Sequence, residues 1–219
     1  MDSGNIGFVL LCAAFVFVMT PGLAMFYGGL VRKKNVVNTM MTSIFIIGVG
    51  IVMWVLFGYS LSFAPSGNAF IGDFRWLGLE GVSLTEGYTD GASIPNMVFS
   101  AFQMMFAVIT PALITGAVAG RMKFKSIFVF TIFWSLIVYY PLAHMVWGQG
   151  GLLGADGIGA LDFAGGDVVH ISSGVSALVL CILLGKRHDY EHSIYRIHNI
   201  PTVVLGASLL MFGWFGFNA

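Results

Sequence analysis

Long runs of apolar residues, separated by short polar segments, dominate this chain. Six runs are long enough to cross a bilayer, which takes about 20 residues of α-helix. They cover residues 6–31, 37–63, 94–120, 127–146, 167–184 and 200–219. No segment between them has the composition of a separate soluble domain. The pattern therefore predicts a single membrane domain, residues 1–219, built as an all-α bundle of about six transmembrane helices.

The composition narrows the class of function. Hydrophobic residues make up 58% of the chain and charged residues 9%, which excludes an ordinary soluble domain. A formal net charge of zero gives no general argument for binding nucleic acid. The sequence contains no glycine-rich phosphate loop after a strand, no His-Glu-x-x-His and no Cys-x-x-Cys. We therefore expect a protein that is not an enzyme and has no cofactor or metal site.

The basic residues predict how the helices are oriented. If the runs alternate across the membrane, nine of the ten lysines and arginines fall on one side, and only Arg75 falls on the other. The nine are Arg32, Lys33, Lys34, Arg121, Lys123, Lys125, Lys186, Arg187 and Arg196. Cytoplasmic loops carry an excess of positive charge. We therefore expect a multi-pass protein of the cell membrane with its amino terminus outside.

Ionisable residues at the start of the fifth run are the most unusual feature of the sequence. Asp162 or Asp167 is placed to accept the free N–H groups of this helix, where a carboxylate also suits the helix dipole. His170 lies about one turn further in, where an unsatisfied polar group is costly. An ionisable residue inside the membrane suggests function. A structural histidine bonded to a neighbouring helix is the alternative.

Three aromatic segments accompany this histidine. Phe102 and Phe106 are four residues apart and therefore share a helix face. Trp147, just after His144, is either an interfacial belt residue or a face that receives a cation. We expect His144 itself to be structural. The segment 213–219 alternates large rings with glycine, which allows close backbone approach. Packing explains each segment alone; their coincidence with His170 favours a binding site.

Together these segments resemble the ammonium transporter family (Amt/Mep/Rh), and its Amt branch in particular. The resemblance covers the whole chain and includes residues 20–29, 102–106, 144–148, 162–170 and 213–219, in that order. It implies a homotrimer whose subunits each have a pore between two inverted five-helix repeats. Residues 1–185 would form the first repeat and 200–219 the truncated start of the second. Because the family has about eleven spans, we expect this sequence to be the N-terminal half of a longer protein.

The resemblance also implies roles for the aromatic residues. An outer site that binds ammonium by cation–π attraction falls on Trp147 and Phe106, with Phe102 beside them. The stacked rings that close the pore fall on Phe106 and Phe217, and Trp214 flanks this gate. The serine that completes the family's outer site lies beyond Ala219 and is absent from this sequence.

Two ionisable residues complete the implied pore. His170 matches the first of two pore histidines that face each other and relay protons, and the second is absent from this sequence. Asp162 matches a buried aspartate that supports the outer site by binding backbone N–H groups. The expected function is to conduct ammonium or ammonia past the gate and His170. Excluding potassium would follow, since potassium has no proton to give up.

Two other functions are alternatives to transport. An ammonium sensor would use the same membrane fold with a signalling domain downstream. A membrane-embedded metalloenzyme using His144, His170 and Asp162 is the weaker alternative, because no reaction can be proposed for it. The charged loop 186–199 is a candidate contact for a PII-type regulatory protein, since cytoplasmic loops of the family dock such regulators.

Overall fold

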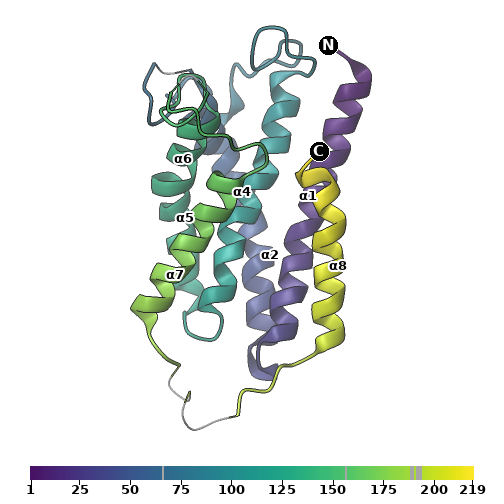
Figure 1. The fold of residues 1–219 in the computed structure, drawn as a ribbon, viewed down its shortest axis with the longest axis vertical. Helices are drawn as coiled ribbons and strands as arrows, with labels where there is room; N and C mark the ends of the chain where they lie inside the picture. The colour runs from purple at the N-terminus through teal and green to yellow at the C-terminus, as the bar shows by residue number, and fades with distance from the viewer. Residues whose placement is uncertain (66, 156, 188–189, 191–193) are drawn as a thin grey trace.

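The computed structural model describes residues 1–65, 67–155, 157–187, 190 and 194–219. Within these ranges the regular structure is entirely helical, and six helical spans are long and apolar enough to cross a membrane (Figure 1). They run Ser3–Leu30, Lys33–Phe63, Asn96–Val118, Phe124–Trp147, Gly166–Leu184 and Ile200–Phe217. Each coincides with a predicted apolar run to within a few residues. The predicted all-α membrane fold is thereby confirmed.

Three spans are unbroken α-helices: α1 (Ser3–Leu30), α4 (Asn96–Val118) and α8 (Ile200–Phe217). The second span starts with the 3₁₀ turn η1 (Lys33–Asn35) and continues through α2 (Val36–Met53), the π-helical turn η2 (Trp54–Gly58) and α3 (Tyr59–Phe63). The fourth combines α5 (Phe124–Trp134), η4 (Ser135–Tyr139) and α6 (Tyr140–Trp147). The fifth combines η5 (Gly166–Ile171) and α7 (Ser172–Leu184). A further short turn, η3 (Leu77–Leu79), lies in the loop after α3.

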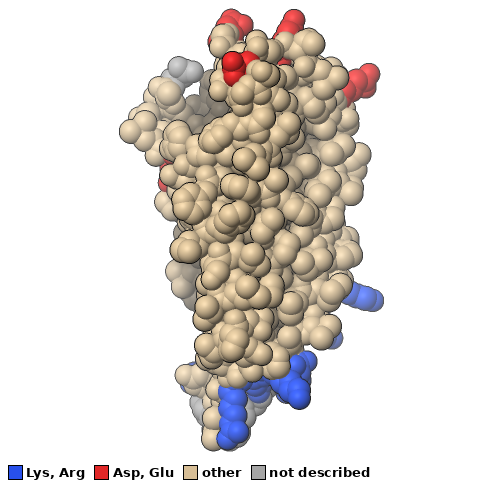
Figure 2. All heavy atoms as spheres, turned by 90° about the vertical axis from the view of Figure 1, so that its right-hand side faces the viewer, with Lys and Arg blue, Asp and Glu red and all other residues tan. Residues whose placement is uncertain are grey.

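Charge divides the bundle into two ends. The acidic end holds the amino terminus and the described parts of the loops 64–95 and 148–165. The basic end holds the loops 31–35 and 119–123 and the described part of the loop 185–199. In the face shown in Figure 2, the acidic side chains gather at one end and most basic side chains at the other. Asp2 ties the first helix into the acidic end, because its N–H donates to the Ser93 carbonyl at 2.8 Å. The charge separation predicted from alternation is therefore present in the fold.

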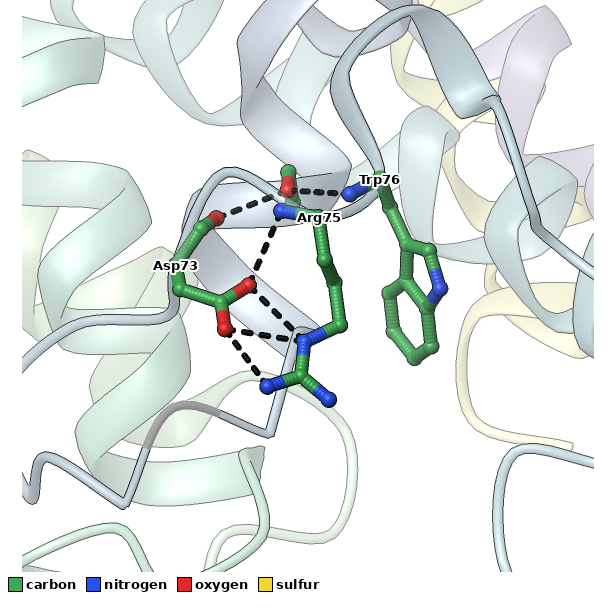
Figure 3. Close-up of polar contacts among 4 residues, drawn as sticks. Asp73, Arg75 and Trp76 are labelled. Atoms are coloured by element: carbon green, nitrogen blue, oxygen red, sulfur yellow. Dashed lines mark hydrogen bonds and ion pairs between the residues drawn. The ribbon is translucent and has the colours of Figure 1, made fainter.

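Arg75 is neutralised within the loop that carries it (Figure 3). Its Nη2 lies 2.7 Å from Asp73 Oδ2, and its Nε donates to the same oxygen at 2.8 Å. This hydrogen-bonded guanidinium holds the pKa of Asp73 below its usual range. Ser60 anchors the turn by donating to the Asp73 carbonyl at 2.7 Å and accepting the Trp76 N–H at 3.0 Å. The described acidic end thus carries a net negative field, which favours the approach of cations.

Small residues allow the first and last helices to pack closely. A Cβ added at Gly206 of α8 would lie 2.6 Å from the carbonyl oxygen of Gly22 in α1. Small residues at such crossings let two membrane helices approach backbone to backbone. Because of this close packing, the end of α8 that contains Trp214 and Phe217 lies beside the halves of α1 and α4 that are nearest to the acidic end. Phe217 is buried there beside Phe106.

Candidate functional site

The turn that leads into the fifth span is built around the Asp162 carboxylate. Its Oδ1 accepts the N–H groups of Gly165 and Gly166 at 2.6 and 2.8 Å. Its Oδ2 accepts those of Asp167 and Val168 at 2.8 and 2.9 Å. Amides at the start of a helix have no acceptor within the helix, so the carboxylate satisfies four donors at once. Position in the sequence left Asp162 and Asp167 as alternatives, the family resemblance favoured Asp162, and in the structure Asp162 accepts these bonds.

Gly165 fixes the position of His170. Its φ of 94° is in the left-handed region, and an added Cβ would lie 2.6 Å from the Val169 side chain. Its carbonyl oxygen accepts the backbone N–H of His170 at 2.9 Å and lies 3.1 Å from the His170 Nδ1. Because a carbonyl oxygen can only accept, a neutral ring bonded here keeps its proton on Nδ1. Nε2 is then the nitrogen that can act as a base.

The imidazole of His170 is exposed and faces the last helix. Its ring centroid lies 5.5 Å from that of Trp214 and 5.7 Å from that of Phe217, with both pairs close to edge-on. The hydrogen bond of the ring goes to a carbonyl of its own turn. The alternative of a structural histidine bonded to a neighbouring helix is therefore not what the structure shows.

An open hollow of about 300 Å³ lies in front of this ring. It is lined by Leu161, Asp162, Phe163, Ala164, Gly166, His170, Trp214, Phe217 and Asn218. Carboxylate, imidazole and aromatic faces thus meet at one place between the loop 148–165, the start of the fifth span and the end of α8. The hollow therefore presents polar groups and aromatic faces together to a small molecule that enters it.

A continuous series of aromatic contacts leads from the hollow into the bundle. Phe217 packs against Trp214 on one side and against Phe106 of α4 on the other, with centroid distances of 5.1 and 4.6 Å. Phe106 then meets Trp147 at 6.1 Å, with the rings nearly perpendicular. Phe102 contacts Phe106 at 5.0 Å from the next turn of the same helix. The two rings predicted to stack as a gate are therefore in contact, but their planes are tilted by 38°.

Trp147 is also linked to the Asp162 turn. Its Nε1 donates to the backbone carbonyl of Asp162 at 2.8 Å. This bond fixes the indole plane against Phe106, which is 3% exposed. One aspartate thus orders both the turn that carries His170 and the tryptophan at the other end of the aromatic series.

The structure brings the predicted residues together in two groups. Asp162, His170, Trp214 and Phe217 line the hollow, whereas Phe106, Trp147 and Phe102 lie behind Phe217 in the aromatic series. The other five residues that line the hollow had no predicted role: Leu161, Phe163, Ala164, Gly166 and Asn218. For Asn218 the available signal was a polar side chain directly after Phe217.

His144 has the structural role expected of it. It is completely buried, and its Nδ1 and Nε2 lie 3.1 and 2.8 Å from the carbonyl oxygens of Ser62 and Asn68. Two backbone carbonyls of the second span and the loop after it therefore enclose the ring. Among the described residues, no three His, Cys, Asp or Glu side chains are grouped so that they could hold a metal ion.

Comparison with known proteins identifies the family. The family model described as "Ammonium Transporter Family" matches residues 7–219. The chain belongs to the ammonium transporter family. It is 52% identical over 219 residues to an ammonium transporter of Bacillus subtilis, a match that covers all of this chain and 52% of that protein.

Solved structures of the family have the same fold. The crystal structure of Saccharomyces cerevisiae Mep2 is 37% identical with a TM-score of 0.87, over all of this chain and 48% of that one. A structure titled "Sensor Amt Protein" is 29% identical with a TM-score of 0.83, over 98% of this chain and 53% of that one. The curated relatives with 41–52% identity are named as ammonium transporters.

The chain spans about half the length of the curated relatives it matches. This proportion agrees with the expectation of an N-terminal half.

Proposed function

We propose that this chain supplies part of an ammonium transporter in which ammonium is recruited at the aromatic series and loses a proton, and the neutral amine then passes His170. Residues 1–185 would form the first repeat and residues 200–219 the start of the second. The observation that carries the proposal is the convergence of an imidazole with aromatic faces on one hollow at the acidic end.

Energetics explain why a proton is removed. A charged side chain at the bilayer centre costs at least about 2.5–3.5 kcal/mol, even on the most lenient scale. Cation–π attraction returns about 0.5–2 kcal/mol per aromatic face, enough to collect ammonium at Trp147 and Phe106 but not to carry a charge through a dry pore. Ammonia has no net charge and avoids this cost. Potassium cannot follow, because it has no proton to give up.

The proton transfer has a simple balance. One N–H bond of ammonium breaks, its electron pair stays on the nitrogen, and the proton passes to a base. In this chain the base is Nε2 of His170, given the Nδ1 contact to the Gly165 carbonyl. Phe106 and Phe217, whose centroids are 4.6 Å apart, would lie between the recruited cation and His170 and must part before ammonium can give its proton to Nε2. Only ammonia would then continue past His170.

The arrangement in the membrane is part of the same proposal. Since the acidic end holds the amino terminus, the positive-inside rule places this terminus outside the cell and the basic end in the cytoplasm. We expect a homotrimer in the plasma membrane. The loop 186–199 remains a candidate contact for a PII-type regulator, although residues 188–189 and 191–193 lie outside the described part.

Substitution of His170 by alanine tests the proposal. The complete transporter containing this sequence is reconstituted in liposomes that hold no regulator, and the ammonium-evoked current is recorded with and without potassium. His170→Ala should abolish the current or allow potassium to compete. His198→Ala, which removes an exposed imidazole at the basic end, should change neither. Transport by His170→Ala that is unchanged and still excludes potassium would contradict the proposal.

A further inference from the structure

Two hydrogen bonds tie the loop 64–95 to the segment that directly follows Trp147. The backbone N–H of Gln149 donates to the Tyr88 hydroxyl at 3.1 Å, and the side-chain Nε2 of Gln149 donates to the Tyr88 carbonyl at 2.9 Å. Trp147 is the last residue of α6, only two positions earlier. One residue of a loop distant in sequence therefore holds the chain at the point where α6 ends.

The ring of Tyr88 is itself held by α4. It stacks on Phe99 with a centroid distance of 4.9 Å and an angle of 6° between the planes. Phe63, the fully buried last residue of α3, packs edge-on against both rings, at 5.5 Å from Tyr88 and 5.1 Å from Phe99. Offset-stacked and edge-on pairs are the arrangements that aromatic rings favour. Tyr88 is thus anchored to α4 by its ring and to the end of α6 by its hydroxyl and carbonyl groups.

This anchoring reaches the two rings that the proposed function assigns to ammonium recruitment. Phe99 and Phe106 are seven residues apart on α4, about two turns, and therefore share a face of this helix. The centroids of Phe106 and Trp147 lie 6.1 Å apart. Cation–π attraction acts within about 6 Å of a ring centroid, so a small cation gains from both rings only while their separation is kept. The Asp162 carbonyl fixes the indole at Nε1, and Tyr88 fixes the backbone that follows it.

We propose that Tyr88 is a positioning residue for ammonium recruitment, because it joins α4 to the end of α6 and thereby sets the separation of Phe106 and Trp147. The inference rests on the proposed function, since Tyr88 has this task only if those two rings bind ammonium. Its effect should fall on the affinity for ammonium and not on the proton transfer at His170. The maximal current and the exclusion of potassium should therefore be unchanged when Tyr88 is altered.

Ammonium-evoked currents of the complete transporter in liposomes test the proposal, with the half-saturating ammonium concentration as the readout. Tyr88→Phe keeps the ring on Phe99 but removes the acceptor of the Gln149 N–H, and it should raise this concentration about threefold. Tyr88→Leu removes the stacked ring as well and should raise it about tenfold. Tyr195→Phe is the matched control, because it removes a hydroxyl that donates to the Leu30 carbonyl at the basic end. It should keep the native half-saturating concentration.

Trp147→Ala separates this proposal from the proposed function. It should itself raise the half-saturating concentration, and adding Tyr88→Phe to it should have no further effect, because Tyr88 acts through the indole. A native half-saturating concentration in Trp147→Ala would overturn both the aromatic recruitment site and the role of Tyr88.

Two other outcomes would overturn the role of Tyr88 alone. In the first, Trp147→Ala raises the half-saturating concentration, whereas Tyr88→Phe and Tyr88→Leu keep the native one. In the second, Tyr88→Phe has the same effect with and without Trp147→Ala, as expected if it weakens the structure generally and does not act through the indole.

Discussion

Replacing Asp162 by asparagine changes the turn before the fifth span with almost no change in shape. The carboxylate accepts four backbone N–H groups, two on each oxygen. In asparagine one of these oxygens becomes an NH₂ group, which is itself a donor, so two amides lose their acceptor. A hydrogen bond to a charged group contributes about 1.5–3 kcal/mol. Because Asp162 is half-buried, water can replace part of the lost hydrogen bonding. The low end of the range therefore applies, which gives a loss of about 3 kcal/mol for two bonds.

Hydrogen–deuterium exchange measures this loss where it occurs. A peptide that covers residues 160–172 reports on the four amides bound by Asp162. If they exchange through local opening, a loss of about 3 kcal/mol should speed exchange about 100-fold. The Trp147 bond goes to the Asp162 backbone and should persist. Transport should nevertheless fall, because the turn that carries His170 loses its order.

Asp167→Asn is the matched control for this experiment. It makes the same chemical change five residues away, and among the described residues the Asp167 carboxylate accepts no hydrogen bond. Exchange of the peptide should therefore stay within a few-fold of the native rate. Equal acceleration in the two variants would refute the reasoning, as would native exchange in Asp162→Asn.

Two further predictions concern the turn and the acidic end. Gly165→Ala should lower the thermal unfolding temperature in detergent, because alanine at a φ of 94° costs about 1–2 kcal/mol before any clash. Gly166→Ala is the control and should have little effect, because its Cβ would meet only a carboxylate oxygen at 3.9 Å. Similar shifts of the unfolding temperature in both variants would disprove the prediction. Arg75→Gln should return the pKa of Asp73 toward its ordinary value. The ion pair stabilises the folded protein fully at pH values above the ordinary pKa of Asp73. This stabilisation is lost as the pH falls through the lowered pKa that Asp73 has in the folded protein. The unfolding temperatures of native protein and Arg75→Gln should therefore converge in acid, and a gap that widens would contradict this.

Much of the fold was predictable from the sequence. Six apolar runs predicted six helical spans, because in hydrocarbon a backbone must satisfy its own hydrogen bonds and a helix does so within one segment. The distribution of lysine and arginine predicted which loops share an end. Both signals are local, and they depend on the bilayer more than on contacts between helices.

The internal irregularities of the spans were not predictable in this way. The second, fourth and fifth spans each contain a π-helical turn, at η2, η4 and η5. Hydropathy is the same for a π-turn and an α-turn, so apolar pattern cannot distinguish them. At η5 the irregularity is visible in the backbone hydrogen bonds, because the Gly165 carbonyl accepts the N–H groups of both Val169 and His170.

The sequence also determined which residues were candidates for the site, but only the tertiary structure decided how they meet. Asp162 and Asp167 were equivalent by position, and only the family resemblance favoured Asp162; the structure shows four N–H groups converging on the two oxygens of Asp162. The contact between Phe106 and Phe217 joins residues 111 positions apart and depends on the close seam of α1 and α8. Spacing along one helix says nothing about such distances. These distances depend on how closely small residues let two helices approach. The approach distance belongs to a pair of helices, so it cannot be predicted from a single apolar run.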